Sequence, residues 1–406
     1  MNKINVLIYL GTALLAFGES FSRGNFPSYV TVLGGSLIDY GFIQSARVVS
    51  NLIFLLPAAY LADKLGHKRL LVIGTLFYVG SYIFIAFAPS WEYLLFGIVG
   101  VGLANGAVMP SRVAILAHNN QIDKIQVFTR NETARWGSLS LGYFVSAGFF
   151  ALAQNEFSHA NLQFTMFATL ASIFLSLFPS LFLTSDEERQ NNREQAESAE
   201  STVNFRSIWV TPQGKFILGF LLINLIIGFG AGFLVPFTQP YFVQRFSLGP
   251  SEVNILNGIA QIITTIFMTG IPVLAARLSD TKVIYITQGL SIPLTIVLAL
   301  SNIFPISLFA FFFRMALMNM SRPAQIALLQ ENIPEAYRAT VQSLMQAGDR
   351  IGRGGSPSLS AMLITETGDF TSSFFITAGT YSTAVTTLYL ITRNLIRNPN
   401  TLNHTK

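Results

Sequence analysis

Charged side chains lie inside several long apolar stretches of this 406-residue sequence. Glu19 and Arg23 are four residues apart, as are Asp349 and Arg353, and this spacing places each pair on one face of a helix. An ionised side chain in the middle of a membrane costs about 2.5–3.5 kcal/mol on insertion scales, so each charge needs a reason. Each pair therefore has two interpretations: a neutralised pair that holds helices together, or part of a polar cavity that faces water and a solute.

Three more arginines in apolar stretches, Arg47, Arg314 and Arg350, have no acidic partner at helical spacing. A guanidinium group binds carboxylate or phosphate through two parallel hydrogen bonds. This surplus of positive charge favours a solute with an anionic group. The alternative is that these arginines bond to backbone carbonyls, or to Glu19 or Asp349 across an interface.

The elements that carry these charges are membrane spans. The chain is 51% hydrophobic and only 11% charged, about half the charge of an ordinary soluble domain. Twelve apolar runs reach the roughly 20 residues that a helix needs to cross a bilayer. The runs are 4–30, 41–62, 69–89, 92–118, 131–154, 161–183, 214–243, 252–277, 283–301, 305–330, 339–365 and 371–393. We expect an all-α integral membrane protein.

The two halves of the chain repeat. Ser111-Arg112 recurs as Ser321-Arg322, and Arg135-Trp136-Gly137 recurs as Arg350-Ile351-Gly352, at nearly one offset. The twelve transmembrane helices are therefore expected in two pseudo-symmetric six-helix bundles. The domains would be an N-terminal bundle over 1–183, a polar cytoplasmic linker over 184–213, and a C-terminal bundle with a short cytoplasmic tail over 214–406.

The lysines and arginines predict the orientation. With the amino terminus inside, the inner segments hold 16 of the 25 Lys and Arg residues, and the outer loops hold only Arg245. Basic residues concentrate in cytoplasmic loops. We therefore expect a multi-pass protein of the plasma or inner membrane with both termini in the cytoplasm.

A short charged turn, Leu61-Ala62-Asp63-Lys64-Leu65-Gly66-His67-Lys68, separates two of the runs. It resembles the signature loop of the major facilitator superfamily of transporters, roughly G-x-L-a-D-r-x-G-r-k, with Ala59 in place of the leading glycine. Pro334-Glu335-Ala336-Tyr337-Arg338 resembles the family's P-E-x-x-R loop. The resemblance covers the whole chain. It implies a secondary transporter that works by alternating access, with a mid-membrane site between two bundles.

The resemblance also implies a cytoplasmic gate at these loops, in which a carboxylate lies against a helix amino terminus. The gate and motif residues are Asp63, Gly66, Lys68, Arg112, Asp280, Arg322, Glu335 and Arg338. The alternative is a set of basic inner loops with no switching role.

Two patterns of the family are absent. The arginine of the fourth-helix motif of proton-coupled members falls on Phe96, and Leu141-Gly142-Tyr143-Phe144 lacks the Gly-Pro signature of antiporters. These departures argue against drug:proton antiport. Glu19 is the first candidate for a proton-coupling group and Asp349 the second, while sodium coupling and facilitated diffusion stay open.

Two further features concern the polar interior. Amides at cavity-compatible depth predict a hydrophilic path: Gln44, Asn51, Asn224, Gln239, Asn257, Gln261 and Asn319. The stretch 352–357, which contains three glycines and Pro357, is expected to interrupt the eleventh helix. Its small residues permit close packing and its proline permits a kink.

Several function classes have no support in the residues. The chain has no cysteine, no His/Asp/Glu cluster with metal-ligand spacing, and no Ser/His/Asp arrangement, so we expect no enzyme, no metal and no cofactor. The basic residues form no continuous stripe, which argues against nucleic acid.

The expected partners are a small-molecule substrate, the lipid bilayer and protons, and the expected state is a monomer. The alternatives are a multidrug or metabolite efflux antiporter, and a membrane sensor or scaffold that moves no solute.

Overall fold

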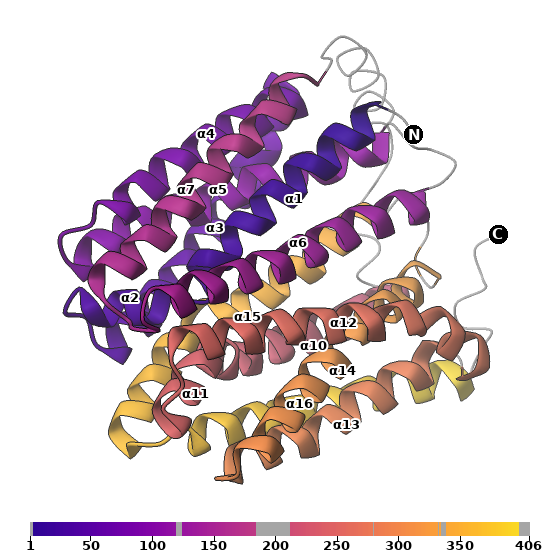
Figure 1. Cartoon of the computed structure of the whole chain (residues 1–406). Coiled ribbons are helices and arrows are strands. Elements are labelled where there is room, and N and C mark those ends of the chain that lie inside the picture. The colour runs from indigo at the N-terminus through magenta and orange to yellow at the C-terminus, as the bar shows by residue number, and fades with distance from the viewer. Residues whose placement is uncertain are drawn as a thin grey trace. The chain divides into compact units, whose positions relative to one another are not determined.

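The computed structural model describes residues 3–118, 124–183, 212–278, 280–331, 333 and 338–397, and these residues form helices and no strand (Figure 1). The helices are α1 (Lys3–Arg23), α2 (Phe26–Val32), α3 (Leu37–Leu65), α4 (His67–Ala86), α5 (Trp91–His118), α6 (Lys124–Leu152), α7 (His159–Leu181), α10 (Pro212–Leu234), α11 (Thr238–Phe246), α12 (Pro250–Leu278), α13 (Asp280–Leu300), α14 (Phe304–Glu331), α15 (Arg338–Thr367) and α16 (Thr371–Arg397). The predicted all-α class is confirmed.

Twelve of these helices correspond to the twelve predicted runs, and α2 and α11 are short continuations of the first and seventh. The sequence missed both breaks. Pro27 lies in the first turn of α2, where a missing N–H costs nothing, and Gly24 and Asn25 form the break before it. Pro236 lies in the corresponding break between α10 and α11. The first and the seventh predicted spans are therefore each a long helix followed by a short one.

Among the described residues, nine helical stretches are long and apolar enough to cross a membrane. The long helices that fall short of this criterion are α3, α6 and α15, which carry several of the charged residues singled out above. Large apolar side chains such as Phe84, Phe96 and Phe182 are more than 60% exposed on the helix surfaces. Such surfaces suit lipid, because a helix satisfies its backbone polar groups internally.

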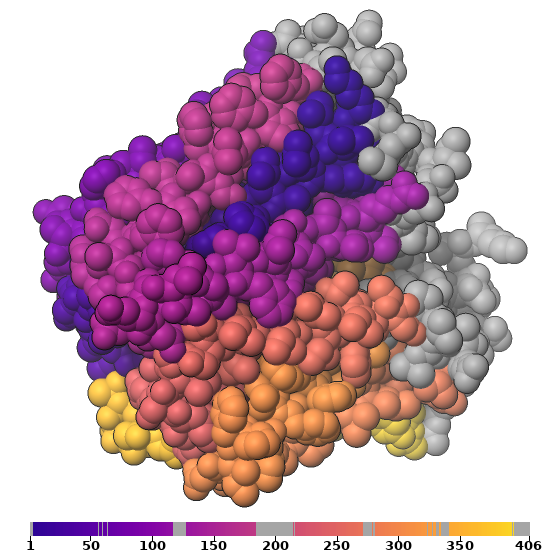
Figure 2. Space-filling view, in the orientation of Figure 1, coloured from indigo at the N-terminus to yellow at the C-terminus, as the bar shows by residue number. Residues whose placement is uncertain are grey.

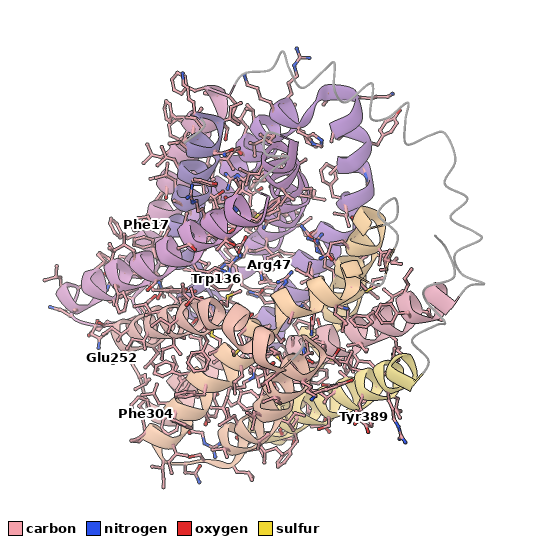
Figure 3. The ribbon with its side chains drawn as sticks, turned by 90° about the vertical axis from the view of Figure 1, so that its right-hand side faces the viewer. Phe17, Arg47, Trp136, Glu252, Phe304 and Tyr389 are labelled. Atoms are coloured by element: carbon pink, nitrogen blue, oxygen red, sulfur yellow. The ribbon has the colours of Figure 1, made fainter. Side chains whose placement is uncertain are left out.

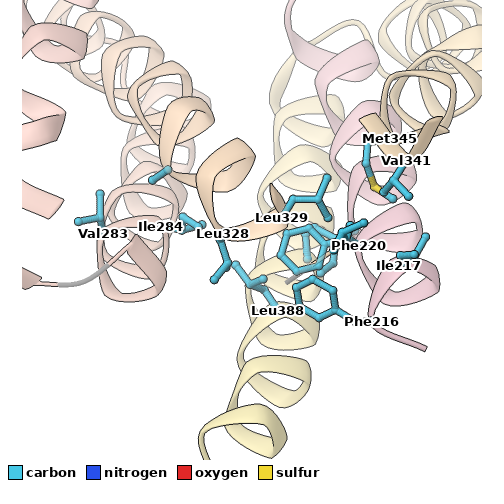
Figure 4. Close-up of a cluster of buried hydrophobic side chains, with 14 of the residues drawn as sticks. Phe216, Ile217, Phe220, Val283, Ile284, Leu328, Leu329, Val341, Met345 and Leu388 are labelled. Atoms are coloured by element: carbon cyan, nitrogen blue, oxygen red, sulfur yellow. The ribbon is translucent and has the colours of Figure 1, made fainter. Parts of the chain in front are cut away.

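The described residues separate into two compact units. The first contains those within Met1–Ser198 and Thr238–Ile262, and the second those within Ala199–Phe237 and Ile263–Lys406. Of the predicted linker, 184–213, only the last two residues lie among the described residues. In the first unit α1 lies between α6 and α7, as the space-filling view shows (Figure 2). In the second unit, buried side chains from α10, α13, α14, α15 and α16 form an apolar core around Phe216, Phe220 and Leu388 (Figure 4).

Glycines facing serines set the close packing of the helices within each unit. A Cβ atom added to Gly142 of α6 would lie 1.9 Å from Ser20 Oγ of α1. The same addition at Gly232 of α10 would lie 1.8 Å from Ser356 Oγ of α15. Small residues let membrane helices approach one another closely, since apolar burial alone gives no preference over lipid.

The predicted interruption of the eleventh helix is wrong. Helix α15 continues from Arg338 to Thr367 with Pro357 inside it. The close packing expected of its small residues is present at Gly352, since a Cβ there would lie 2.1 Å from the backbone oxygen of Leu225 on α10. Glycine and proline are tolerated in membrane helices because neighbouring groups satisfy the backbone.

Candidate functional site

The first polar cluster, which we call the Glu19 cluster, consists of Glu19, Arg23, Tyr78 and Asn105 in the first unit. Arg23 Nη2 lies 2.7 Å from Glu19 Oε2, and the Tyr78 hydroxyl donates to Glu19 Oε1 at 2.9 Å. Asn105 Nδ2 donates in turn to the Tyr78 hydroxyl at 3.2 Å. The Glu19 side chain is 4% exposed and the Arg23 side chain 41%, so the carboxylate is buried behind an accessible arginine.

Three helices position this cluster. Glu19 and Arg23 lie one turn apart on α1, Tyr78 lies on α4 and Asn105 on α5. The Tyr78 ring stacks on Tyr82, with ring centroids 5.7 Å apart, and the Tyr82 hydroxyl bonds to Ser22 Oγ at 2.8 Å. The carboxylate therefore has one charged donor and one neutral donor in a rigid setting. Arg135 and Arg47 are further electrostatic neighbours of this carboxylate.

Arg112 lies in the interior of the first unit. It is 3% exposed, and neither Nη1 nor Nη2 has a hydrogen-bond partner among the described residues. A Cβ on Gly11 of α1 would lie 3.7 Å from its Nη2, so the guanidinium faces α1. Its electrostatic neighbours include Glu19 and Tyr78. Arg322, its counterpart in the sequence repeat, is exposed on α14.

The second polar cluster, the Tyr381 cluster, consists of Arg314, Asp349, Arg353 and Tyr381 in the second unit. Arg314 of α14 is 4% exposed, and its Nη2 donates to the Tyr381 hydroxyl of α16 at 3.1 Å. Arg353 Nε lies 3.1 and 3.0 Å from the two Asp349 carboxylate oxygens, one turn away on α15. Tyr381 is also an electrostatic neighbour of Arg353. The tyrosine thus links a buried arginine to a half-buried ion pair.

Both i, i+4 ion pairs therefore form, while the three remaining arginines make no direct ion pair with a carboxylate among the described residues. Arg47 lies half-buried on α3 (Figure 3) and makes no ion pair. Arg314 bonds to a neutral hydroxyl, and its Nε is buried without a partner. Arg350 has a buried Nη1 without a hydrogen-bond partner, and its electrostatic neighbours are Asp349 and, more weakly, Arg322.

The charged turn between α3 and α4 consists structurally of one residue, Gly66. Its φ of +83° lies in the left-handed region, where a side chain is strained, so the glycine of the motif is required by the backbone. Lys64 places its Nζ 4.5 Å from the Tyr60 ring centroid, and Lys68 is half-buried at the beginning of α4. Glu335 and the side chains of Asp63, Asp280 and Arg338 lie outside the described residues.

Three of the seven amides predicted to line a hydrophilic path bond within their own helix. Asn224, Asn257 and Asn319 each donate to the carbonyl four residues earlier. Asn51 is different, because it donates to the Gly102 carbonyl of α5 at 3.0 Å and so joins two helices. Gln44, Gln239 and Gln261 are buried.

The sequence missed the two tyrosines at the centres of the clusters. Tyr78 is 59 residues from Glu19, and Tyr381 is 67 residues from Arg314. Neither lies near a charged motif. The one available signal was that a buried tyrosine hydroxyl needs a hydrogen-bond partner. Among the described residues, no group of three metal-ligating side chains occurs.

Comparison with known protein families matches most of the chain to one family. The family model described as Major Facilitator Superfamily matches residues 8–357 and 220–404. The quinolone resistance protein NorA of Staphylococcus aureus is 22% identical over 258 residues, which span 63% of this chain and 62% of NorA. The chain therefore aligns with less than two thirds of that relative's length.

Solved structures resemble the whole fold. A bacterial homologue of the human lysosomal transporter Spinster, in an inward-facing and occupied conformation, superposes with a TM-score of 0.77 at 12% identity, covering 97% of each chain. The xylose transporter XylE from E. coli, in an inward-open conformation, gives 0.71 at 15% identity and 95% coverage of each chain. At these identities the likeness shows the fold alone.

Proposed function

The chain belongs to the major facilitator superfamily and is a multi-pass membrane transporter, and from this premise we propose that it moves a small solute with an anionic group by alternating access. In this mechanism, a mid-membrane site is exposed to one side of the membrane and then to the other. Membership of the family does not specify the class of solute or the residues that bind it.

One observation supports the proposal that the solute is anionic. Arg47, Arg314 and Arg350 lie on helices of a membrane protein and make no direct ion pair with a carboxylate among the described residues. A guanidinium group without a counter-ion is costly at that depth, and an anionic solute would compensate it. Arg23 adds to this capacity, because its side chain is 41% exposed although it already pairs with Glu19.

Proton coupling through Glu19 forms the second half of the proposal. The anionic group of the solute would compete with Glu19 for Arg23. Once Arg23 is withdrawn, the buried carboxylate favours a proton, which links solute binding to protonation. Asp349 ranks second, since its side chain is 33% exposed and therefore better hydrated.

We also propose the cytoplasmic orientation of both termini, the monomeric state and the gate. The support for the orientation is the distribution of lysine and arginine, 16 in the inner segments against one in the outer loops. The support for the gate is the family-like turn at Gly66, whose left-handed backbone requires glycine. Its acidic and basic members remain assigned by resemblance.

Replacing Arg47, Arg314 or Arg350 by Gln should reduce transport of the solute by more than about tenfold, since a lost charged hydrogen bond costs about 1.5–3 kcal/mol. The measurement is initial uptake by purified protein in proteoliposomes. Arg69→Gln is the control, because Arg69 is exposed at the beginning of α4 and loses the same charge. Normal uptake by all three variants would reject the anionic solute.

A second candidate function is export of a larger organic compound. The similarity to the quinolone resistance protein NorA favours it. Drug export predicts that cells producing the protein tolerate a quinolone better than cells producing Glu19→Gln. Transport of a small anion predicts equal tolerance in the two strains.

A further inference from the structure

The beginning of α12 packs with the helices of the first unit, although α12 belongs to the second sequence repeat. Residues Thr238–Ile262 cluster with the first unit, and residues from Ile263 onward cluster with the second. The helix is continuous from Pro250 to Leu278. Any movement of its second half with the second unit must therefore bend α12 or break the contacts of its first turns.

A buried amide pair forms the centre of these contacts. Asn254 Nδ2 of α12 donates to Asn25 Oδ1, in the break between α1 and α2, at 3.0 Å, and both residues are 0% exposed. Asn25 Nδ2 donates to the Phe21 carbonyl at 2.7 Å and to Ser146 Oγ of α6 at 3.2 Å. A Cβ on Gly24 would lie 2.3 Å from Asn254 Oδ1, so the glycine leaves room for the amide.

A second set of contacts joins the beginning of α12 to α6 and to the turn that follows α6. Asn155 Nδ2 lies 3.0 and 2.9 Å from the Glu252 carboxylate oxygens, and Asn155 Oδ1 accepts from the Ser251 N–H at 2.8 Å (Figure 3 labels Glu252). Ser251 Oγ donates to the Ala147 carbonyl at 3.0 Å. Asn155 has a φ of +55°, a left-handed conformation that asparagine tolerates better than most residues.

We propose that Asn25, Asn155, Ser251, Glu252 and Asn254 form a latch that holds the beginning of α12 against the first unit in one conformation of the transport cycle, and that Asn254 determines how firmly it holds. None of these contacts joins two opposite charges, so water can replace each partner when the latch opens. The latch residues thereby bias the equilibrium between two conformations without preventing their exchange. The proposal rests on the transport cycle proposed above.

The test compares two asparagines on one helix. Asn254 and Asn257 each donate to the carbonyl four residues earlier, at 2.8 and 3.0 Å, but Asn254 also donates to Asn25, in the break between α1 and α2. The chain has no cysteine, so Ala147→Cys provides a single thiol on α6 at a position that is 3% exposed. A water-soluble maleimide then reports how often α12 leaves α6.

We expect Asn254→Ala to raise the labelling rate of that thiol about tenfold, since the lost bond leaves a buried acceptor without a partner in the latched state. Asn257→Ala should leave the rate unchanged. Asn155→Ala, in the turn that follows α6, should also raise the labelling rate. This variant provides the test if Asn254→Ala does not fold. Equal rates for Asn254→Ala, Asn155→Ala and Asn257→Ala would overturn the latch.

The labelling needs no solute, which separates the two proposals. Faster labelling in Asn254→Ala together with no uptake by the unsubstituted protein would support the latch and reject the transport function. Unchanged labelling in all variants together with normal solute uptake would reject the latch and leave the transport function standing.

Discussion

Replacing Glu19 by Gln should abolish accumulation of solute driven by a pH gradient, while exchange of solute at equal concentrations survives. Glutamine keeps the size of the side chain. Its amide oxygen can accept from Arg23, which now lies 2.7 Å from Glu19 Oε2, while its NH2 group can donate to the Tyr78 hydroxyl, which now lies 2.9 Å from Glu19 Oε1. It cannot take up and release a proton. Both activities are measured in proteoliposomes with radiolabelled solute.

Glu132→Gln is the matched control. Glu132 also pairs with an arginine on its own helix, Arg135, at 3.4 Å, but its side chain is 49% exposed. The substitution removes the same charge from the same unit without touching a buried carboxylate, so accumulation should persist. If Glu19→Gln still accumulates solute on a pH gradient, Glu19 is not the coupling group.

Replacing Gly352 by Ala should destabilise the second unit by about 3 kcal/mol or more, since overpacking a close helix contact forces backbone shifts. The added Cβ would lie 2.1 Å from Leu225 O and 2.7 Å from Phe229 N, both backbone atoms of α10. A flexible side chain could move aside, but these atoms belong to the partner helix. Thermal unfolding of the detergent-purified protein measures the effect.

Gly355→Ala tests whether the loss of stability comes from the contact of Gly352 with α10 or from the replacement of a glycine as such. Gly355 lies on the same helix, one turn beyond Gly352, and no heavy atom lies within 4 Å of the Cβ it would gain. Its melting temperature should equal or exceed that of the unsubstituted protein, because alanine favours a helix by about 1 kcal/mol over glycine. Equal melting temperatures for Gly352→Ala and Gly355→Ala would contradict the close-packing account.

Most of the fold could be predicted from the sequence because bilayer thickness sets the length of each apolar run. The twelve runs coincide with twelve long helices. The break at Pro236 was missed because apolar composition continues across it, whereas the break at Asn25 lies in a polar stretch that was counted within the first run. At 352–357 the expected close packing is present but the expected interruption is not, because Gly352 packs against α10 inside a continuous helix.

The candidate site was only partly predictable. The ion pairs Glu19–Arg23 and Asp349–Arg353 follow from spacing on one helix, and both form. Tyr78, Tyr381 and Asn254 are neutral side chains that reach their partners across 59, 67 and 229 residues of sequence. No local pattern marks such contacts, because tertiary packing alone brings the partners together.

Transport of a small anionic solute can be tested by counterflow in proteoliposomes. Proteoliposomes that contain the purified protein are loaded in turn with organic anions, sugars and cationic drugs, and each is tested with and without a pH gradient. We expect counterflow for at least one organic anion, with accumulation when the gradient is imposed and loss of accumulation in Glu19→Gln. Counterflow of sugars or cationic drugs alone would contradict the anionic solute, and binding without flux of any compound would contradict transport itself.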